Sequence, residues 1–126
     1  MILSDEVAFW PTARQAEAIR TGEISSRELL ELLIARIEKI NPALNAVITF
    51  DYEGARQLAD EADAKLKRGQ VTGPLHGIPV TIKDALETNG IRSTGGASEL
   101  HNHLSLIHIS EPTRRYAISY AVFGLK

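Results

Sequence analysis

The feature that most limits the fold of this chain is a strand–helix–strand succession between residues 46 and 83. Residues 46–50 (Ala-Val-Ile-Thr-Phe) and 78–83 (Ile-Pro-Val-Thr-Ile-Lys) are rich in β-branched side chains, which favour strands. Residues 53–68 between them are rich in alanine and charge and are followed by Gly69, as expected for a helix. This order within about forty residues indicates a βαβ unit, and hence a parallel sheet covered by helices.

A further helix is expected near the start of the chain, and more sheet is needed to complete the fold. Residues 12–20 predict a short helix with Ala16 and Ile19 on its buried side. Two parallel strands alone cannot form a stable sheet, because such strands are buried on both faces. The sequence therefore predicts an α/β fold in which helices pack on an incomplete mixed or parallel sheet.

A second, longer helix is indicated by its cap and by its apolar periodicity. Ser25 and Glu28 have the spacing of a capping box, which places the start of the helix after Ser25. Asn41-Pro42 is expected to end it, because a residue before proline avoids the helical region. Apolar residues recur every three or four positions and are expected to form the core: Leu29, Leu33, Ile37 and Ile40.

Composition excludes several classes of function. The 14 basic and 16 acidic residues leave a net charge of −2, which provides neither a nucleic-acid footprint nor a polybasic patch for a membrane. The absence of cysteine excludes disulfides, thiol catalysis and cysteine-ligated metals. Residues 1–10 lack the features of a secretory signal, and no stretch approaches the roughly 20 apolar residues of a membrane span. A cytoplasmic protein that binds neither nucleic acid nor membrane is therefore expected.

Lys83 is the residue with the clearest chemical potential. In a strand, Thr81 and Lys83 point to one face, opposite the alternating apolar residues. A lysine at the end of a buried strand loses solvation, and a lysine kept neutral near pH 7 can act as a general base. The alternative is that Lys83 leaves the sheet and pairs with Asp84 or with water, because lysine is almost never buried unless it is paired.

Residues 73–84 (Gly-Pro-Leu-His-Gly-Ile-Pro-Val-Thr-Ile-Lys-Asp) favour the catalytic interpretation, because they resemble the lysine motif of the amidase-signature family. The resemblance extends upstream through residues 24–29 and 35–46, and downstream through residues 89–98. It covers about residues 5–103 and implies the N-terminal part of the amidase-signature fold.

The resemblance implies an amidohydrolase that cleaves carboxamide C–N bonds through a serine–cis-serine–lysine triad. Neutral Lys83 would draw a proton through a bridging serine, held by a cis peptide bond, so that a nucleophilic serine attacks the amide carbonyl. Backbone N–H groups would stabilise the oxyanion, and water would hydrolyse the acyl-enzyme. The family implies a small-molecule amide substrate, and neither a metal nor an organic cofactor.

The sequence departs from the family in lacking the glycine- and serine-rich signature that carries both serines. By their order, residues 93–98 match the loop after the lysine motif, so Ser93 and Ser98 are expected to frame the pocket rather than to catalyse. Lys83 is thus the one catalytic residue expected here, and the chain by itself is expected to be an inactive fragment.

The histidines are weaker candidates. His101, His103 and His108 form a loose cluster with no evident carboxylate to orient them, and no metal site is expected. His76 lies within the lysine motif and is expected to pack or to hydrogen-bond in the turn before the strand. Gly77 is expected to serve the backbone geometry of the same turn.

The composition changes near residue 104. Residues 1–103 hold 11 basic and 15 acidic side chains, whereas residues 104–126 hold three basic residues, one acidic residue and three of the seven aromatics. The second segment does not resemble the amidase family and is similar to the translation of a sequencing-library adapter. The expected organisation is therefore the N-terminal part of an amidase-signature domain at 1–103 and a non-native tail at 104–126. The alternative is a genuine, divergent extension.

Two other functions stay open. Residues 84–92 look more like those of a free-standing amidase, but the resemblance also fits the A subunit of a tRNA-amidotransferase, which would add partner subunits and aminoacyl-tRNA. The other alternative is a non-catalytic helical interaction module in which Lys83 is incidental. A serine signature in the reading frame beyond residue 103 favours the enzyme, and a genuine stop codon there favours the module.

Overall fold

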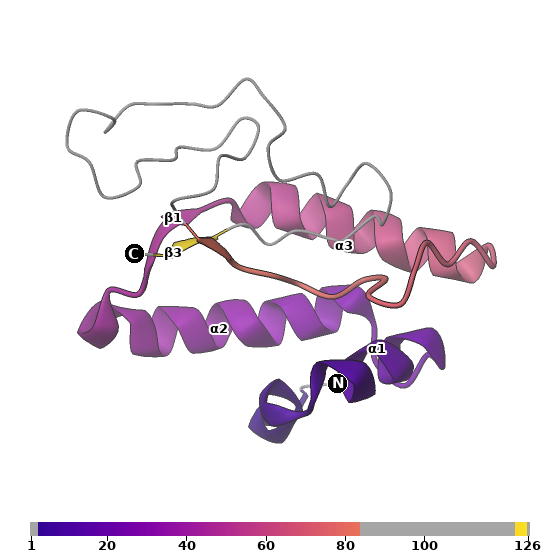
Figure 1. Cartoon of the computed structure of the whole chain (residues 1–126), viewed down its shortest axis with the longest axis horizontal. Coiled ribbons are helices and arrows are strands. Elements are labelled where there is room, and N and C mark those ends of the chain that lie inside the picture. The colour runs from indigo at the N-terminus through magenta and orange to yellow at the C-terminus, as the bar shows by residue number, and fades with distance from the viewer. Residues whose placement is uncertain (1–2, 84–122, 126) are drawn as a thin grey trace.

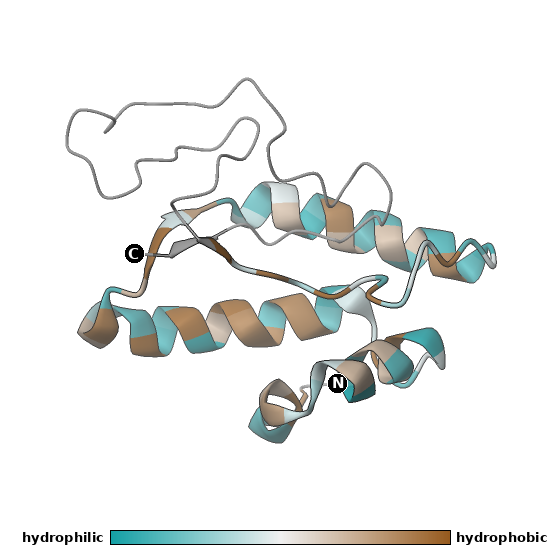
Figure 2. Ribbon diagram, in the orientation of Figure 1, coloured by the Kyte–Doolittle hydropathy of each residue, from teal (hydrophilic) through white to brown (hydrophobic). Residues whose placement is uncertain are grey.

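The structure is a computed structural model that describes residues 3–83 and 123–125 of the chain, with side chains for residues 3–82. Helices α2 and α3 lie alongside each other, and the segment that leads into strand β2 passes next to them (Figure 1). Hydrophobic residues gather along α2 and along this segment (Figure 2). The elements in chain order are the 3₁₀ helix η1 (Asp5–Phe9), α1 (Thr12–Arg20), α2 (Ser26–Leu44), β1 (Val47–Phe50), α3 (Tyr52–Lys67), β2 (Ile82–Lys83) and β3 (Phe123–Leu125).

The N-terminal helices form the first of two hydrophobic clusters. Helix α1 has the predicted bounds and buries Ala16 and Ile19, as expected. The helix η1 was not predicted; it is fixed to α1 by Gln15, whose Nε2 donates to the Val7 carbonyl at 2.9 Å. The buried residues of this cluster are Val7, Ala16, Ala18, Ile19, Ile24, Leu29 and Ile78.

Helix α2 begins where predicted and ends later than predicted. Its start is closed by the capping box: the Glu28 N–H donates to Ser25 Oγ at 3.0 Å, and the Ser25 N–H donates to Glu28 Oε2 at 2.8 Å. The predicted stop at Asn41-Pro42 is wrong, because the helix continues to Leu44 with Pro42 inside its last turn.

The side chain of Asn41 explains this late end. Its Oδ1 accepts from the N–H groups of Ala46 and Val47 at 2.9 and 2.8 Å, and its Nδ2 donates to the Val47 carbonyl at 2.8 Å. Asn45 follows in the left-handed conformation, with φ of 48°, and its N–H donates to the Asn41 carbonyl at 2.6 Å. These bonds offset the N–H that Pro42 lacks and the unfavourable helical conformation of the residue before it.

Helix α3 lies within one residue of its predicted bounds, and Gly69 follows it with φ of 72°, as its predicted end requires. It packs on α2 through a face of alanines, which are small enough for the two backbones to approach closely. Full burial of a leucine such as Leu30 on the facing side of α2 contributes about 1.5–3 kcal/mol. This second cluster consists of Leu30, Ile34, Val47, Ala55 and Ala59.

A carboxylate on α3 also holds the first turn of α2. Asp63 accepts from the backbone N–H groups of Ser26 and Arg27, at 2.8 and 3.1 Å. The first N–H groups of a helix have no partner within it, and the helix dipole favours a negative charge beside them. Asp63 therefore caps a helix to which it does not belong, and this fixes where α3 lies along α2.

The sheet is mixed, and the predicted parallel strand–helix–strand unit is wrong. Strand β3 lies between the other two and pairs antiparallel with β1 and parallel with β2. Strands β1 and β2 therefore run in opposite directions. Asp51 alone separates β1 from α3, and connections that turn a chain from a strand into a crossover helix usually take about two to six residues. The mixed form of the predicted α/β fold is the one observed.

Strand β2 is shorter than the run of residues 78–83 that predicted it. Residues 78–81 lead into it outside any strand, and Pro79 among them has no N–H to donate to a sheet. Strand β3 belongs to the segment 104–126; the interpretation of that segment as a non-native tail stays a prediction.

We expect Asp63→Ala to lower the free energy of unfolding by about 1–2 kcal/mol, because it removes an interhelical cap with two charge-assisted bonds. Asp60→Ala is the matched control on the same helix, since Asp60 contacts the Arg27 guanidinium at an exposed position. Its loss is expected to stay below about 1 kcal/mol. Urea denaturation of both variants checks this, and equal losses would contradict the capping role.

Candidate active-site region

The predicted catalytic lysine lies in β2, at the end of a segment that starts with a tight turn. The backbone of Lys83 pairs in parallel register with Leu125 of β3. Residues 72–78 form the turn, which is closed by a backbone hydrogen bond from the Ile78 N–H to the Leu75 carbonyl at 3.1 Å. The place of Lys83 therefore depends on what holds this turn.

His76 is the buried centre of the turn, with 5% of its surface exposed. Its Nε2 donates to the Ala62 carbonyl of α3 at 2.8 Å, while its Nδ1 accepts from the Thr72 N–H at 3.3 Å and lies 2.8 Å from Thr72 Oγ1. A carbonyl only accepts, so Nε2 carries a proton, and Nδ1 is the atom that faces Thr72. The predicted hydrogen-bonding role of His76 in this turn is confirmed.

Ser26, at the first turn of α2, holds the next residue of the turn. Its side chain is fully buried, and its Oγ donates to the Gly77 carbonyl at 2.5 Å. Gly77 has φ of 79°, and a Cβ there would come within 3.1 Å of Ser26 Cβ and 3.2 Å of Ile19 Cγ2. The left-handed backbone and this close approach both require glycine, as the sequence predicted.

Three polar residues that hold the turn and its helices were not singled out from the sequence. They are Ser26, Thr72 and Asp63. Ser26 and Asp63 contact partners that only the folded chain brings near, whereas Thr72 contacts His76 within the same turn. For two of them, Ser26 and Asp63, the sequence holds a feature that could have drawn attention to the residue. Ser26 duplicates the capping serine before it, and Asp63 is a charge placed directly after the buried Ala62.

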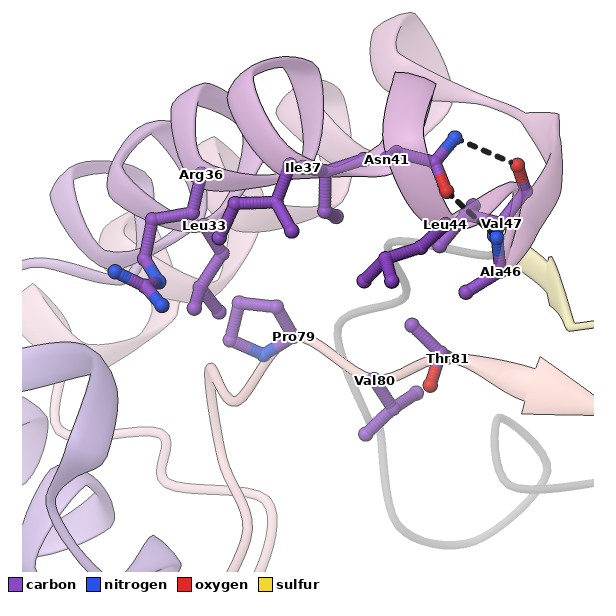
Figure 3. A pocket seen from close by; sticks show the side chains of 11 residues that line it. Leu33, Arg36, Ile37, Asn41, Leu44, Ala46, Val47, Pro79, Val80 and Thr81 are labelled. Atoms are coloured by element: carbon purple, nitrogen blue, oxygen red, sulfur yellow. Dashed lines mark hydrogen bonds between the residues drawn. The ribbon is translucent and has the colours of Figure 1, made fainter.

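An apolar cleft of about 360 Å³ opens between α2 and the segment that leads into β2 (Figure 3). Residues 79–81 line one side of it, and Leu33 and Ile37 lie across from them. Asn41, at one end of the cleft, is engaged in closing α2 (Figure 3). The cleft therefore offers mainly apolar contact beside the chain that carries Lys83.

The predicted core of α2 is only partly correct, because part of the predicted apolar stripe lines the cleft. In the predicted stripe only Leu29 is fully buried; Leu33 and Ile37 are half-buried, and Ile40 is 38% exposed. The stripe faces the segment before β2, which covers it in part, while the neighbouring face of the helix packs against α3. The buried residues of α2 are Ser26, Leu29, Leu30 and Ile34.

Charged residues join α2 to α3 at the surface. Arg56 makes a two-pronged contact with Glu31, through Nε at 2.7 Å and Nη2 at 3.1 Å, and Arg27 Nε donates to the same carboxylate at 2.8 Å. The hydrogen bonds from Arg56 hold the pKa of Glu31 below its usual value; partial desolvation opposes this shift, and the hydrogen bond from Arg27 adds to it. The carboxylate of Glu31 is thus ionised across the neutral pH range.

Several predicted residues lie outside the described part of the chain. These are Ser93, Ser98, His101, His103 and His108. Within residues 3–83 and 123–125, no group of three or more acidic or histidine side chains is placed to hold a metal ion. None of the helices in that part combines the length and hydropathy that crossing a membrane requires.

Comparison with known proteins identifies the family. A sequence profile described as Amidase matches residues 28–109, which is more than half of the chain and includes Lys83. The chain belongs to the Amidase family. The match continues past the boundary predicted at residue 103, so the Amidase profile does not itself mark where the native segment ends.

Relatives within the Amidase family include several kinds of amide-processing protein. The chain is 40% identical over 108 residues to the A subunit of a glutamyl-tRNA(Gln) amidotransferase from Roseiflexus sp. (strain RS-1), covering 86% of this chain and 22% of that protein. It is 30% identical over 104 residues to an acylamidase of Rhodococcus erythropolis, covering 82% of this chain and 22% of that protein.

The structure confirms the amidase-signature fold. The peptide amidase of Stenotrophomonas maltophilia superposes with a TM-score of 0.83 at 26% identity, covering 97% of this chain and 25% of that one. The chain thus spans about a fifth of the length of the curated relatives it matches and about a quarter of this solved structure.

We expect Glu31→Gln to flatten the acid side of the stability curve. Because the folded-state pKa of Glu31 is lowered, its contribution is fully present above the unfolded-state pKa of about 4.3 and is lost as pH falls through the folded-state value. The Tm of the unaltered chain should therefore fall more steeply below about pH 4.5 than that of Glu31→Gln. The difference in the free energy of unfolding should stay below about 1 kcal/mol, because the site is half-exposed.

The control for this measurement is Glu61→Gln, because Glu61 meets Gln57 Nε2 at 3.3 Å on the surface of α3. The Tm of both variants is compared with that of the unaltered chain from pH 7 to about pH 3. If the Tm of Glu31→Gln changes with pH in parallel with that of the unaltered chain, the ion pairs of Glu31 with Arg27 and Arg56 do not contribute to acid stability.

Proposed function

We propose that residues 1–103 are the N-terminal part of an amide-hydrolysing enzyme of the amidase-signature type, and that Lys83 is its general base. The observation that carries the proposal is the Amidase match across the lysine motif. The fold supports it, because the turn of the motif is bound to α2 and α3 at Gly77 and His76, only a few residues before Lys83.

In the proposed reaction a neutral Lys83 accepts the proton that a nucleophilic serine releases as it attacks the amide carbonyl. A bridging serine passes that proton on, and the leaving amine then receives it when the C–N bond breaks. Water attacks the resulting acyl-enzyme, its proton moving along the same route, and releases the carboxylate. Both serines are proposed to lie in the parent enzyme, meaning the protein in which residues 1–103 are followed by the serine signature.

A second candidate is the A subunit of an amidotransferase. The observation that favours it is the greater identity to the amidotransferase chain, 40%, than to the acylamidase, 30%. Both candidates share amide C–N cleavage through Lys83. They differ in partners, so turnover of simple amides by the parent enzyme alone supports the free-standing amidase, and a requirement for added subunits supports the amidotransferase.

The proposal predicts that Lys83→Arg is nearly as damaging in the parent enzyme as Lys83→Met. Methionine removes the proton acceptor and keeps much of the volume, and a guanidinium does not give up its proton in a protein. Both variants should lower kcat by roughly 10²–10⁴-fold with KM little changed. The check is steady-state kinetics together with Tm; a folded Lys83→Arg enzyme with near-parental kcat ends the catalytic assignment.

The proposal also predicts that the 126-residue chain hydrolyses no amide by itself, because Lys83 then has no serine to serve. Release of amine from a simple carboxamide by the purified chain is the measurement. The control is Lys83→Ala, which should leave any background unchanged. Turnover that Lys83→Ala abolishes would refute the prediction.

A further inference from the structure

We propose that Ser26 and His76 are positioning residues for Lys83, fixing where the segment 78–83 begins. The inference rests on the catalytic role proposed for Lys83. Its structural basis is that two consecutive residues of the turn are bound to two different helices: His76 to Ala62 of α3, and Gly77 to Ser26 of α2.

The hydroxyl of Ser26 has no part in starting α2. The capping box of Ser25 and Glu28 already serves that purpose, and Asp63 accepts the backbone N–H of Ser26. The side chain is therefore available for the turn, and it donates to the Gly77 carbonyl at 2.5 Å in a fully buried place. A buried carbonyl left without this donor would have to move toward another one.

The ring of His76 fixes the same turn from the other side. It joins the turn to α3 through Nε2, and it binds the first residue of the turn, Thr72, at Nδ1. With 5% of its surface exposed, the ring has no room to exchange these partners for water.

The constraint is carried from the turn to Lys83 by a short and stiff stretch of chain. Ile78 is buried in the first cluster, and the ring of Pro79 locks its own φ. A displacement of the turn is therefore passed on along the six residues to Lys83. A shift of about 1 Å at a catalytic group can cost about 10²-fold in rate.

The experiment compares four variants of the parent enzyme. Ser26→Ala removes one donor, and Thr72→Val removes another while keeping the side-chain shape. Thr72→Ser keeps that hydroxyl, and Ile34→Val is the stability control, because Ile34 lies in the second cluster away from the turn. We expect Ser26→Ala and Thr72→Val to lower kcat by about 10–100-fold with KM little changed. Ile34→Val and Thr72→Ser should keep kcat.

Tm is measured for every variant, so that loss of folded protein is separated from loss of position. Equal kcat in Ser26→Ala and Ile34→Val at similar Tm would overturn the inference. So would a Thr72→Ser enzyme as slow as Thr72→Val, because the hydroxyl would then not be what matters.

A second measurement separates this inference from the proposed function. Hydrogen exchange at the backbone amides of Ile82 and Lys83 is followed by NMR in the 126-residue chain. We expect Ser26→Ala to lose protection there and Ile34→Val to retain it. Retained protection in Ser26→Ala overturns the positioning role whatever Lys83 does. Lost protection, combined with an active Lys83→Arg enzyme, refutes the proposed function and leaves the positioning intact.

Discussion

The contact on which the rest of this structure depends is the buried hydrogen bond between Ser26 and Gly77. It joins residues 51 positions apart, so it closes the chain around α3 and brings the lysine motif back to the start of α2. Gly77 can approach because it has no side chain, and its carbonyl needs a donor because the residue is buried. The first hydrophobic cluster, with Ile19 and Ile78, and the entry into β2 adjoin this closure.

Helices α1, α2 and α3 were predictable because their signals are local. The capping box of Ser25, the glycine after α3 and the apolar spacing all lie within the segments they define. What failed depended on the folded chain. The end of α2 is decided by an asparagine side chain that bonds beyond the helix, and the strand directions are decided by a third strand far along the sequence. Periodicity also could not tell which face of α2 would meet α3 and which would line the cleft.

The candidate site shows the same division. Strand alternation makes Lys83 a possible base, but the pattern alone favours a solvated or paired lysine, and only the resemblance of residues 73–84 favours catalysis. The residues that hold the motif in place were beyond local reasoning. Ser26 and Asp63 are ordinary polar residues in sequence, and their importance comes from partners that contact them across the fold.

The alanine face of α3 leaves one degree of freedom that hydrophobic contact cannot remove. Large side chains form ridges that lock into the grooves of a neighbouring helix, but Ala55 and Ala59 present a nearly smooth surface. Such a face sets how close two helices come and says little about their relative slide. The carboxylate of Asp63 accepts from two successive N–H groups in the first turn of α2, and this fixes the position of one helix along the other. Apolar burial thus determines the separation of the pair, and one acidic side chain determines its register.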